Sequence, residues 1–453
     1  MDTNMTRYDY DCIVLGSGPA GGEIAATLAQ AGRRVAMTES RAIGGVCPLR
    51  GCNPKKVLLG AAEAVDAARK LQGKGLVGEP AVHWPELMAF KRSFTEPVPD
   101  KAGAHYESLG IDIYEGPSRL TGPHEADADG EAISGASIAV AVGMVPRSLP
   151  IPGTELTIDS DAFLELDELP ERIVFIGGGF VAMEFAHMAA RCGSRCTLLV
   201  RSGRALRQFD PDLVEALLAA GPEAGVETRL FTPTTAIERH GDGYVARGGK
   251  DGGTSFEADL VVNCAGRVPA TAGLGLDAAG VEAGPGGVVV NEYMQSVSAP
   301  HVYAAGDVAA TPFALTPTAT IEARAAAHNI LHGNQRTPDR TGVPSVVFSL
   351  PPLAAAGLSE EDARRSGMNL EVLTGDLAES FSWKRLGETH GAYKLLLDAD
   401  AGVLVGAHVF GHSAEELINT FALAIRHAIP VDRLRDTVWA YPTCGYQLKH
   451  MFA

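Results

Sequence analysis

Residues 12–21 read CIVLGSGPAG, and this stretch predicts the fold of the N-terminal part of the chain. The apolar run Cys12–Leu15 predicts a buried strand, and Gly16, Gly18 and Gly21 follow it in the GxGxxG pattern. These glycines permit a tight turn and let backbone N–H groups reach a pyrophosphate at the N-terminus of the next helix. The stretch therefore predicts the first half of a βαβ unit that binds a dinucleotide.

The residues that follow complete this unit. An alanine-rich helix precedes a second strand, Val35–Thr38, which ends at Glu39. An acid about 20 residues after the glycines is placed to hydrogen-bond the ribose of an adenosine. A GxGxxG pattern alone also occurs where a strand and a helix merely pack closely, but strand, helix and acid together favour dinucleotide binding.

Two cysteines come directly after the unit, in the stretch GGVCPLRGCNPKK at residues 44–56. An apolar run follows them, so we expect a helix with Cys47 and Cys52 at or near its first turn. The positive end of a helix and nearby lysines favour thiolate over thiol. Without a second cysteine pair or a nearby histidine, zinc binding is disfavoured. The spacing therefore predicts a pair for thiol–disulfide exchange.

A second βαβ unit begins at Arg172. The strand Ile173–Ile176 leads into GGGFVA, a GxGxxA pattern, and a helix continues through Glu184. The second strand of this unit ends in Arg201, with Arg207 close behind, where the first unit has an acid. A carboxylate would accept from a ribose 2′-hydroxyl, whereas arginines pair with a 2′-phosphate. A solvated basic loop is the alternative, but on an acidic chain this position favours NADP(H).

Composition narrows the class of protein. The chain has 453 residues, 46% hydrophobic and 21% charged, which is ordinary for a globular protein of about three domains. A net charge of −17 argues against a nucleic-acid binder or a binder of anionic membranes. No apolar run reaches the ~18 residues of a membrane span, and the first residues lack a signal-peptide layout. Seven cysteines do not make a secreted disulfide framework, so we expect a cytoplasmic protein.

Several motifs together run along essentially the whole chain: GSGPAG, GGVCPLRGCNPKK, GGGFVAMEFA, RSGRALRQFD, GRVP, YAAGDV and LTP. The chain resembles the class I flavoprotein disulfide reductases, which include glutathione reductase, dihydrolipoamide dehydrogenase and mercuric reductase. The resemblance implies that electrons pass from NADPH through FAD to a Cys47–Cys52 disulfide and on to an acceptor. It also implies a homodimer whose C-terminal domain reaches into the partner's active site.

The resemblance assigns roles to single residues. Cys52 becomes the charge-transfer sulfur beside the isoalloxazine, and Cys47 the interchange sulfur that faces the acceptor. Lys55 and Glu184 match the ion pair beside flavin N5, and Phe180 stands where glutathione reductases usually carry a tyrosine lid. The implied FAD contacts are Gly16, Gly18, Pro19, Ala20, Gly21, Glu39, Gly45, Val46, Lys56, Ser118, Gly143, Arg267, Gly306, Asp307 and Thr316. The implied NADPH contacts are Gly177, Gly178, Gly179, Phe180, Val181, Ala182, Arg201, Arg207 and Gly266.

The expected fold class is α/β, with two Rossmann-like dinucleotide-binding domains and an α+β C-terminal dimerisation domain. After residue 342 the sequence alternates short strands with helices and carries no glycine-rich phosphate loop, which is typical of an interface domain. The expected boundaries are 1–153 for the first part of the FAD domain, 154–270 for the NADPH domain, 271–340 for the second part of the FAD domain and 341–453 for the dimerisation domain.

The C-terminal motif departs from the family. Its members carry HPT followed by a glutamate, a His–Glu dyad that shuttles protons, whereas this chain reads AYPTCGYQLKHM. Tyr441 occupies the histidine position, and Tyr446 or Gln447 the glutamate position. A phenol is a poor base at neutral pH, and general acid–base help is typically worth ~10²–10⁴-fold. Ordinary disulfide turnover is therefore expected to suffer unless another group, for example His450, substitutes.

Cys444, three residues after Tyr441, leaves three interpretations open. It is a third redox thiol, a soft-metal ligand together with Cys47, or a small buried residue in an interface turn. Mercuric reductases also lack the histidine, but their terminal cysteine pair is absent here, and no resident metal site is expected. Ala26 and Ala102 stand where glutathione reductases contact glutathione, so the fit to that substrate is poor.

The acceptor stays open as well. A disulfide or a related thiol-reactive sulfur compound is the first choice. A metal ion, a quinone or another electrophile is the alternative, because these acceptors need less proton transfer. A third interpretation is a flavin-bound redox sensor with little turnover.

Overall fold

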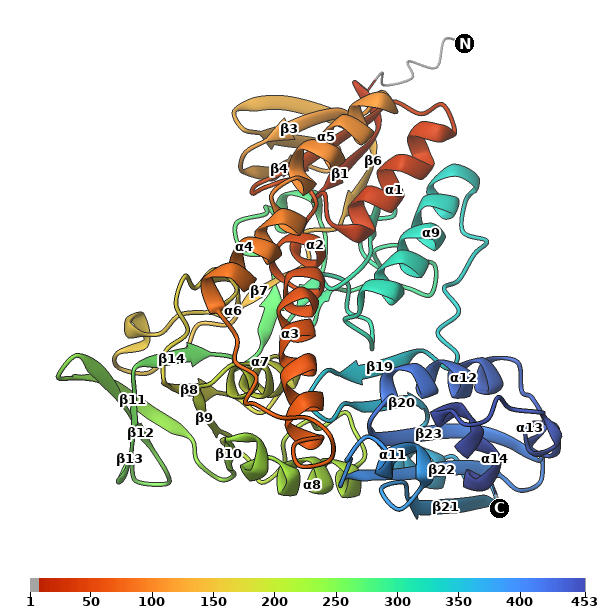
Figure 1. The fold of residues 1–453 in the computed structure, drawn as a ribbon. Coiled ribbons are helices and arrows are strands. Elements are labelled where there is room, and N and C mark those ends of the chain that lie inside the picture. Colours follow the sequence, from red (N-terminus) through yellow and green to blue (C-terminus); the bar gives the residue numbers. More distant parts are fainter. Residues whose placement is uncertain (1–7, 453) are drawn as a thin grey trace, which may run out of the picture. The chain divides into compact units, whose positions relative to one another are not determined.

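The computed structural model describes residues 8–452, which form two compact units (Figure 1). The first unit comprises the chain up to residue 56 together with residues 89–147 and 267–340. The second comprises residues 57–88, 148–266 and the chain from residue 341. The domain boundaries expected from the sequence are finer than this division and stay a prediction.

The first unit contains the predicted N-terminal βαβ motif. Its strands β1 (Tyr10–Leu15) and β2 (Val35–Glu39) are parallel, and helix α1 (Pro19–Gln30) joins them. The sheet runs in the order β3-β2-β1-β6-β5-β4, with β18 beside β6. Residues 12–15 of β1 and residues 138–140 of β6 are fully buried, so these parts of the two strands form the centre of the core of this unit.

The remaining elements of the first unit are α2 (Val46–Arg50), α5 (Val98–Ser108), β3 (Asp112–Glu115), β4 (Ser118–Gly122), β5 (Glu125–Ala128), β6 (Glu131–Val140), β7 (Met144–Pro146), β15 (Arg267–Pro269), β16 (Ala283–Gly284), β17 (Gly287–Val288), β18 (Val302–Ala304), α9 (Thr316–His332) and the 3₁₀ turn Leu276–Ala279. Helices α3 (Cys52–Lys70) and α4 (Trp84–Thr95) have residues in both units.

The second unit contains the second predicted βαβ motif. Strands β8 (Arg172–Ile176) and β9 (Arg195–Leu199) are parallel and are joined by α7 (Phe180–Arg191). The four-stranded parallel sheet has the order β10-β9-β8-β14, and an antiparallel sheet β11-β12-β13 accompanies it. The C-terminal part forms a five-stranded antiparallel sheet in the order β19-β20-β23-β22-β21, with α12 packed on it. Two Rossmann-like sheets and a C-terminal α+β part confirm the predicted fold class.

The remaining elements of the second unit are α6 (Ser160–Phe163), α8 (Pro211–Ala220), β10 (Val226–Arg229), β11 (Thr234–His240), β12 (Gly243–Gly248), β13 (Thr254–Ala258), β14 (Leu260–Asn263), β19 (Pro344–Val347), β20 (Leu353–Gly357), α10 (Glu360–Arg365), β21 (Leu370–Asp376), α11 (Phe381–Lys384), β22 (Gly391–Asp398), β23 (Val403–Gly411), α12 (Ala414–Arg426), α13 (Val431–Asp436), α14 (Leu448–Met451) and the 3₁₀ turns Thr154–Leu156, Pro222–Ala224 and Cys444–Gln447.

Several details differ from the sequence-based expectation, among them the cysteine stretch and one strand of the C-terminal sheet. The cysteine stretch forms two helices instead of one, because α2 ends at Arg50, Gly51 interrupts the helix, and α3 begins at Cys52. Strand β20 was not predicted, since its sequence LAAAG is poor in β-formers; it is a strand because it pairs on both sides, with β19 and β23. Among residues 8–452 no helix has the length and the apolar composition that a membrane span needs.

Candidate active site

The turn between β1 and α1 can be made only with glycine at two positions. Gly16 has a φ of 102°, and a Cβ there would lie 2.5 Å from the carbonyl oxygen of Ala141. A Cβ on Gly21 would lie 1.8 Å from the carbonyl oxygen of Gly16. Because no side chain fits, the backbone N–H groups at the start of α1 stay accessible to an anion such as a pyrophosphate.

The cysteine loop is tied to this turn. Gly45 has a φ of 77°, and a Cβ there would lie 2.4 Å from the Cα of Gly18. The backbone N–H of Gly44 donates to Ser17 Oγ (2.9 Å), and Ser17 Oγ donates to the buried Glu39 (2.6 Å to Oε2). The sequence prediction missed Ser17, although it lies inside the glycine pattern. The glycine turn and an acid at the end of β2 fit the pyrophosphate and the ribose of FAD.

Other expected FAD contacts cluster around the same sheet. A Cβ on Gly306, the residue before Asp307, would lie 3.1 Å from the Cβ of Ala20 at the start of α1. Burial raises the pKa of the Asp307 carboxyl, and Arg267 partly opposes this rise. Ser118 Oγ lies 2.8 Å from Thr38 Oγ1. Pro19 is the first residue of α1, Val46 is the first residue of α2, Lys56 lies on α3, and Gly143 follows β6 with a φ of 66°.

Cys47 and Cys52 lie in the first unit as thiols that are not bonded to each other. Cys47 is on α2, and Cys52 is the first residue of α3, with its Sγ 3.6 Å from Thr316 Oγ1. The pKa of Cys47 is raised, first by its hydrogen bond to Cys52 and then by burial, while Thr316 opposes the rise. Cys47 therefore keeps its proton and is the donor in this hydrogen bond, and Cys52, the more exposed of the two, lies at the positive end of α3.

The second glycine turn has open space at one of its glycines, Gly179. A Cβ on Gly177 would lie 2.3 Å from the carbonyl oxygen of Cys264, and one on Gly178 would lie 2.7 Å from Val200 Cγ1. Around Gly179, by contrast, nothing lies within 4 Å of an added Cβ. The open space at Gly179, together with the 46% exposed side chain of Phe180, lies at the start of α7, where a dinucleotide would approach.

The arginines of the loop after β9 are exposed. Arg204 Nη2 donates to the carbonyl oxygen of Phe209 (2.7 Å), which holds the loop in a turn. Arg201 and Arg207 make no ion pair with any residue between 8 and 452. Their guanidinium groups are therefore available to an anionic ligand. Val181 and Ala182 belong to the first turn of α7, and Gly266 lies between β14 and β15.

Helix α7 carries three buried polar side chains on one face. Glu184 Oε1 accepts from the backbone N–H of Phe348 (2.9 Å), and His187 Nδ1 lies within hydrogen-bond distance of the backbone of Leu350 (3.1 Å to its oxygen). Arg191 Nη2 also donates to the carbonyl oxygen of Leu350 (2.8 Å). Spaced three and four residues apart, these side chains fix α7 to the segment before β20. Lys55 belongs to the first unit and Glu184 to the second, so the expected ion pair stays a prediction.

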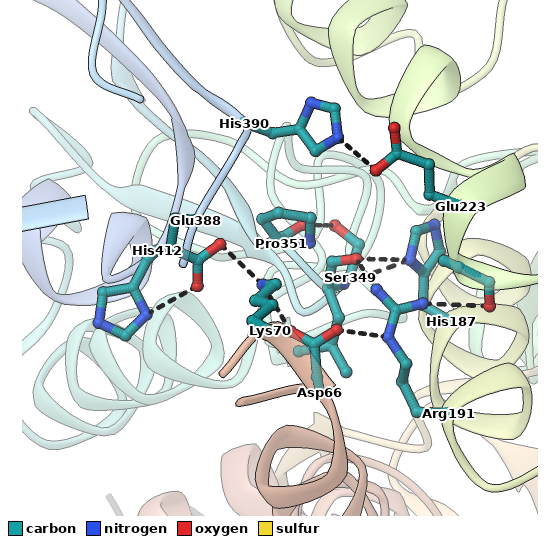
Figure 2. Close-up of polar contacts among 12 residues, drawn as sticks. Asp66, Lys70, His187, Arg191, Glu223, Ser349, Pro351, Glu388, His390 and His412 are labelled. Atoms are coloured by element: carbon teal, nitrogen blue, oxygen red, sulfur yellow. Dashed lines mark hydrogen bonds and ion pairs between the residues drawn. The ribbon is translucent and has the colours of Figure 1, made fainter. Parts of the chain in front are cut away.

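Figure 2 shows a series of ion pairs that begins at Arg191 and continues to Glu388. Arg191 Nε donates to Asp66 on α3 (2.6 Å), Asp66 pairs with Lys70 (2.6 Å), and Lys70 pairs with Glu388 (2.7 Å). His412 Nδ1 lies 3.6 Å from Glu388 Oε1. The sequence prediction missed these residues. A signal was nevertheless present, because polar residues recur at a helical interval in the otherwise apolar helix FVAMEFAHMAAR.

The residues that replace the expected proton relay lie at the C-terminus. Tyr441 is 68% exposed, and its ring packs edge-on against Tyr446 at 4.8 Å. Lys449 Nζ donates to Tyr446 Oη (2.5 Å), and the His450 ring lies 5.6 Å from the Tyr446 ring. The cluster therefore holds phenols, an ammonium and an imidazole, but no carboxylate.

Cys444 lies in the same segment and is half-buried. Burial raises the pKa of its thiol, while a hydrogen bond with Ser413 and the charge of Arg385 lower it. The net shift is upward, so this thiol stays protonated near neutral pH. Within residues 8–452 no group of three or more histidine, cysteine or acidic side chains is arranged to hold a metal ion.

Comparison with known proteins identifies the family. Residues 10–327 match the pyridine nucleotide-disulphide oxidoreductase family, and residues 343–452 match its dimerisation domain. The chain is 32% identical to glutathione reductase of Burkholderia cepacia over 441 residues, covering 97% of both chains. It is 34% identical to dihydrolipoyl dehydrogenase of Thermus scotoductus over 439 residues, covering 96% of this chain and 95% of the relative.

A solved structure agrees with these relatives. The Cu(II) complex of the HOCl-induced flavoprotein disulfide reductase RclA from Escherichia coli superposes with a TM-score of 0.88 at 27% identity. The match covers 98% of this chain and 99% of that one. The chain therefore belongs to the FAD-dependent pyridine nucleotide-disulphide oxidoreductases.

Proposed function

We propose that the protein is an NADPH-dependent reductase that uses the Cys47–Cys52 pair to reduce a disulfide or a related thiol-reactive sulfur compound. The observation that carries the proposal is the hydrogen bond from Cys47 to Cys52, beside Thr316 and at the start of α3. FAD, held by the first glycine turn, would supply the transfer of electrons from the nicotinamide to this sulfur pair.

The geometry of the pair gives the sulfur chemistry. Cys47 passes its proton to Cys52 along their hydrogen bond, and the resulting Cys47 thiolate attacks one sulfur of the acceptor disulfide. The acceptor S–S bond breaks, and the departing thiolate takes a proton from water. Cys52 then releases its proton and attacks the Cys47 sulfur of the mixed disulfide. This step frees the second acceptor thiol and restores the Cys47–Cys52 disulfide.

The coenzyme assignment rests on the loop after β9. Arg201 and Arg207 are exposed and make no ion pair with the described residues, so they are available for a 2′-phosphate. A glutathione reductase and a dihydrolipoyl dehydrogenase match the chain with similar identity and over similar lengths. Similarity therefore does not choose between NADPH and NADH.

The dimerisation domain supports a homodimer, with Tyr441 and Cys444 contributing to the site in which the dithiol meets its acceptor. Lys55 and Glu184 are proposed as the ion pair beside the flavin. A cytoplasmic location is proposed too, because a reducing compartment keeps such thiols reduced.

A metal ion is the second candidate acceptor. Tyr441 replaces the histidine that would donate protons to a leaving thiol, and electron transfer to a metal ion needs no such donor. Thiolates bind soft ions such as Cu(I), and the similar RclA has been solved as a Cu(II) complex. In this case the dithiol would be oxidised to the disulfide as two Cu(II) ions, the substrate, are reduced to Cu(I).

An anaerobic titration with NADPH tests the proposal. A long-wavelength charge-transfer band is expected, and Cys52→Ser should abolish it. The reduced protein is then offered disulfides, Cu(II) and quinones. Loss of turnover in Cys47→Ser supports the dithiol route, whereas unchanged turnover would mean that the acceptor meets the flavin directly. No NADPH oxidation with any acceptor would contradict the enzyme proposal and favour a redox sensor.

A further inference from the structure

Phe231, just after β10, combines two unfavourable features. Its φ is 54°, in the left-handed region that a bulky side chain rarely adopts. Its side chain is also 68% exposed, although phenylalanine is among the residues that proteins bury. Strain of this kind persists only where the surrounding structure holds it, and it is found most often at binding and catalytic sites.

Backbone hydrogen bonds hold this strained residue against the loop after β9. The N–H of Phe231 donates to the carbonyl oxygen of Ser202 (3.1 Å), and the N–H of Thr232 donates to that of Val200 (2.8 Å). The tip of the ring touches the same loop, since a Cβ on Gly203 would lie 2.1 Å from the ring carbon Cζ. The ring is therefore fixed beside the loop that carries Arg201, with most of its surface open to solvent.

The first βαβ unit offers a comparison within the chain. There too the turn after the third strand is bonded to the end of the second, because the N–H of Gly116 donates to the carbonyl oxygen of Glu39 (2.8 Å). The first unit has a glycine at this turn, whereas the second has an exposed aromatic ring. The two units thus differ in two ways near the same place. The counterpart of Gly116 is Phe231, and the counterpart of Glu39 is Val200, with Arg201 one residue further on.

We propose that Phe231 is the platform on which the adenine of NADPH stacks. An exposed aromatic face beside arginines without an ion pair is suited to a ligand that joins a flat base to a phosphate. Arg201 and Arg207 take the 2′-phosphate, and Phe231 takes the base. The proposal rests on the coenzyme assignment made above and adds a residue that the glycine and arginine motifs do not contain.

Binding of two redox-inactive ligands tests the platform on the purified flavoprotein. Titration calorimetry with 2′-phospho-ADP-ribose and with ADP-ribose measures affinity without any turnover. Phe231→Ala should weaken both ligands by the same factor, about tenfold, because both contain adenine. Arg201→Ala should weaken only the first. Phe381→Ala, which removes a ring 57% exposed on α11, should change neither.

Two further variants separate binding from folding. Phe231→Gly removes the ring and also relieves the backbone strain, so it should melt no lower than the wild type yet bind as weakly as Phe231→Ala. Phe231→Trp keeps the platform, and its extra emission should be quenched when 2′-phospho-ADP-ribose binds.

Affinities of Phe231→Ala within twofold of the wild type for both ligands would overturn the platform. So would tryptophan emission in Phe231→Trp that stays unchanged at saturation. Equal wild-type affinity for the two ligands would contradict the NADPH assignment alone, and the comparison between Phe231→Ala and wild type would still decide the platform.

Discussion

Helices α1 and α7 occupy the same place in two βαβ units but are held by different forces. The buried face of α1 consists of Ala20, Gly21, Gly22 and a few aliphatic residues, and it carries no charge. The buried face of α7 includes Glu184, His187 and Arg191. The first helix therefore depends on close packing alone, whereas the second adds charges and hydrogen bonds to its apolar packing. Changes of size should damage the first unit, and changes of charge the second.

The largest effect is expected when one methyl group is added to the first glycine turn, at Gly21. Gly21→Ala places a Cβ 1.8 Å from a backbone oxygen, and backbone cannot move aside as a side chain can. We expect that this variant is purified without flavin and has a lower melting temperature than the wild type. Gly179→Ala is the control for an added methyl group, because its Cβ meets nothing within 4 Å and its φ of −88° suits alanine. The counterpart of Gly21 in the second turn is already an alanine, Ala182. The Gly179→Ala variant should stay yellow, and absorbance and melting curves measure both outcomes. A flavin-loaded, stable Gly21→Ala would break the contrast between the two units.

The second prediction removes a charge next to α7. Asp66→Asn leaves the buried guanidinium of Arg191 without its carboxylate, and such a loss typically costs ~3–5 kcal/mol of unfolding free energy. Asp259→Asn is the control, because its ion pair with Arg172 is about a third exposed and such pairs are worth ~1 kcal/mol or less. Urea unfolding followed by circular dichroism compares the two. Similar losses of unfolding free energy in both variants would mean that the buried Asp66–Arg191 pair stabilises the protein no more than the exposed Asp259–Arg172 pair.

The third prediction concerns the ends of the second strands. Glu39 is buried and bonded to Ser17, whereas Arg201 and Arg207 are exposed. Replacing both arginines by alanine should weaken NADPH by about tenfold to hundredfold, because charge-assisted bonds to the 2′-phosphate are lost. NADH, which lacks that phosphate, should change little. Stopped-flow reduction of the flavin at varied coenzyme concentration gives both affinities, and equal weakening would contradict the 2′-phosphate assignment.

These contrasts also show how far the sequence alone reaches. Periodic and local signals predicted well: both glycine turns, their strands and helices, and the position of Cys52 at a helix start follow from spacing, although Cys47 lies on a separate short helix. What the sequence did not reveal depends on residues distant in the chain. Asp66 meets Arg191, and Phe231 meets Gly203, only once the sheets have formed. Strand β20 was missed for the same reason, because its partners on both sides override the low strand propensity of its alanines.

The last prediction is a pH dependence that belongs to the second unit. Burial, and then the charge of Arg191, lower the pKa of His187 from 6.5 to about 3. Between these two values the unfolded chain binds a proton that the folded chain does not, so stability falls as the pH decreases from 6.5 towards 3. One proton contributes a slope of at most about 1.4 kcal/mol per pH unit.

The variant His187→Asn isolates this group, because asparagine still hydrogen-bonds the backbone of Leu350 but does not titrate. Its unfolding free energy should fall less steeply than that of the wild type just below pH 6.5. Asp66 acts in a different range: burial raises its pKa, but Arg191 and Lys70 outweigh this, and the net pKa lies below 3.8. Its stabilisation is therefore lost only below pH 3.8, as the carboxylate is protonated. Parallel slopes in wild type and His187→Asn above pH 3.8 would assign the acid sensitivity to groups other than His187.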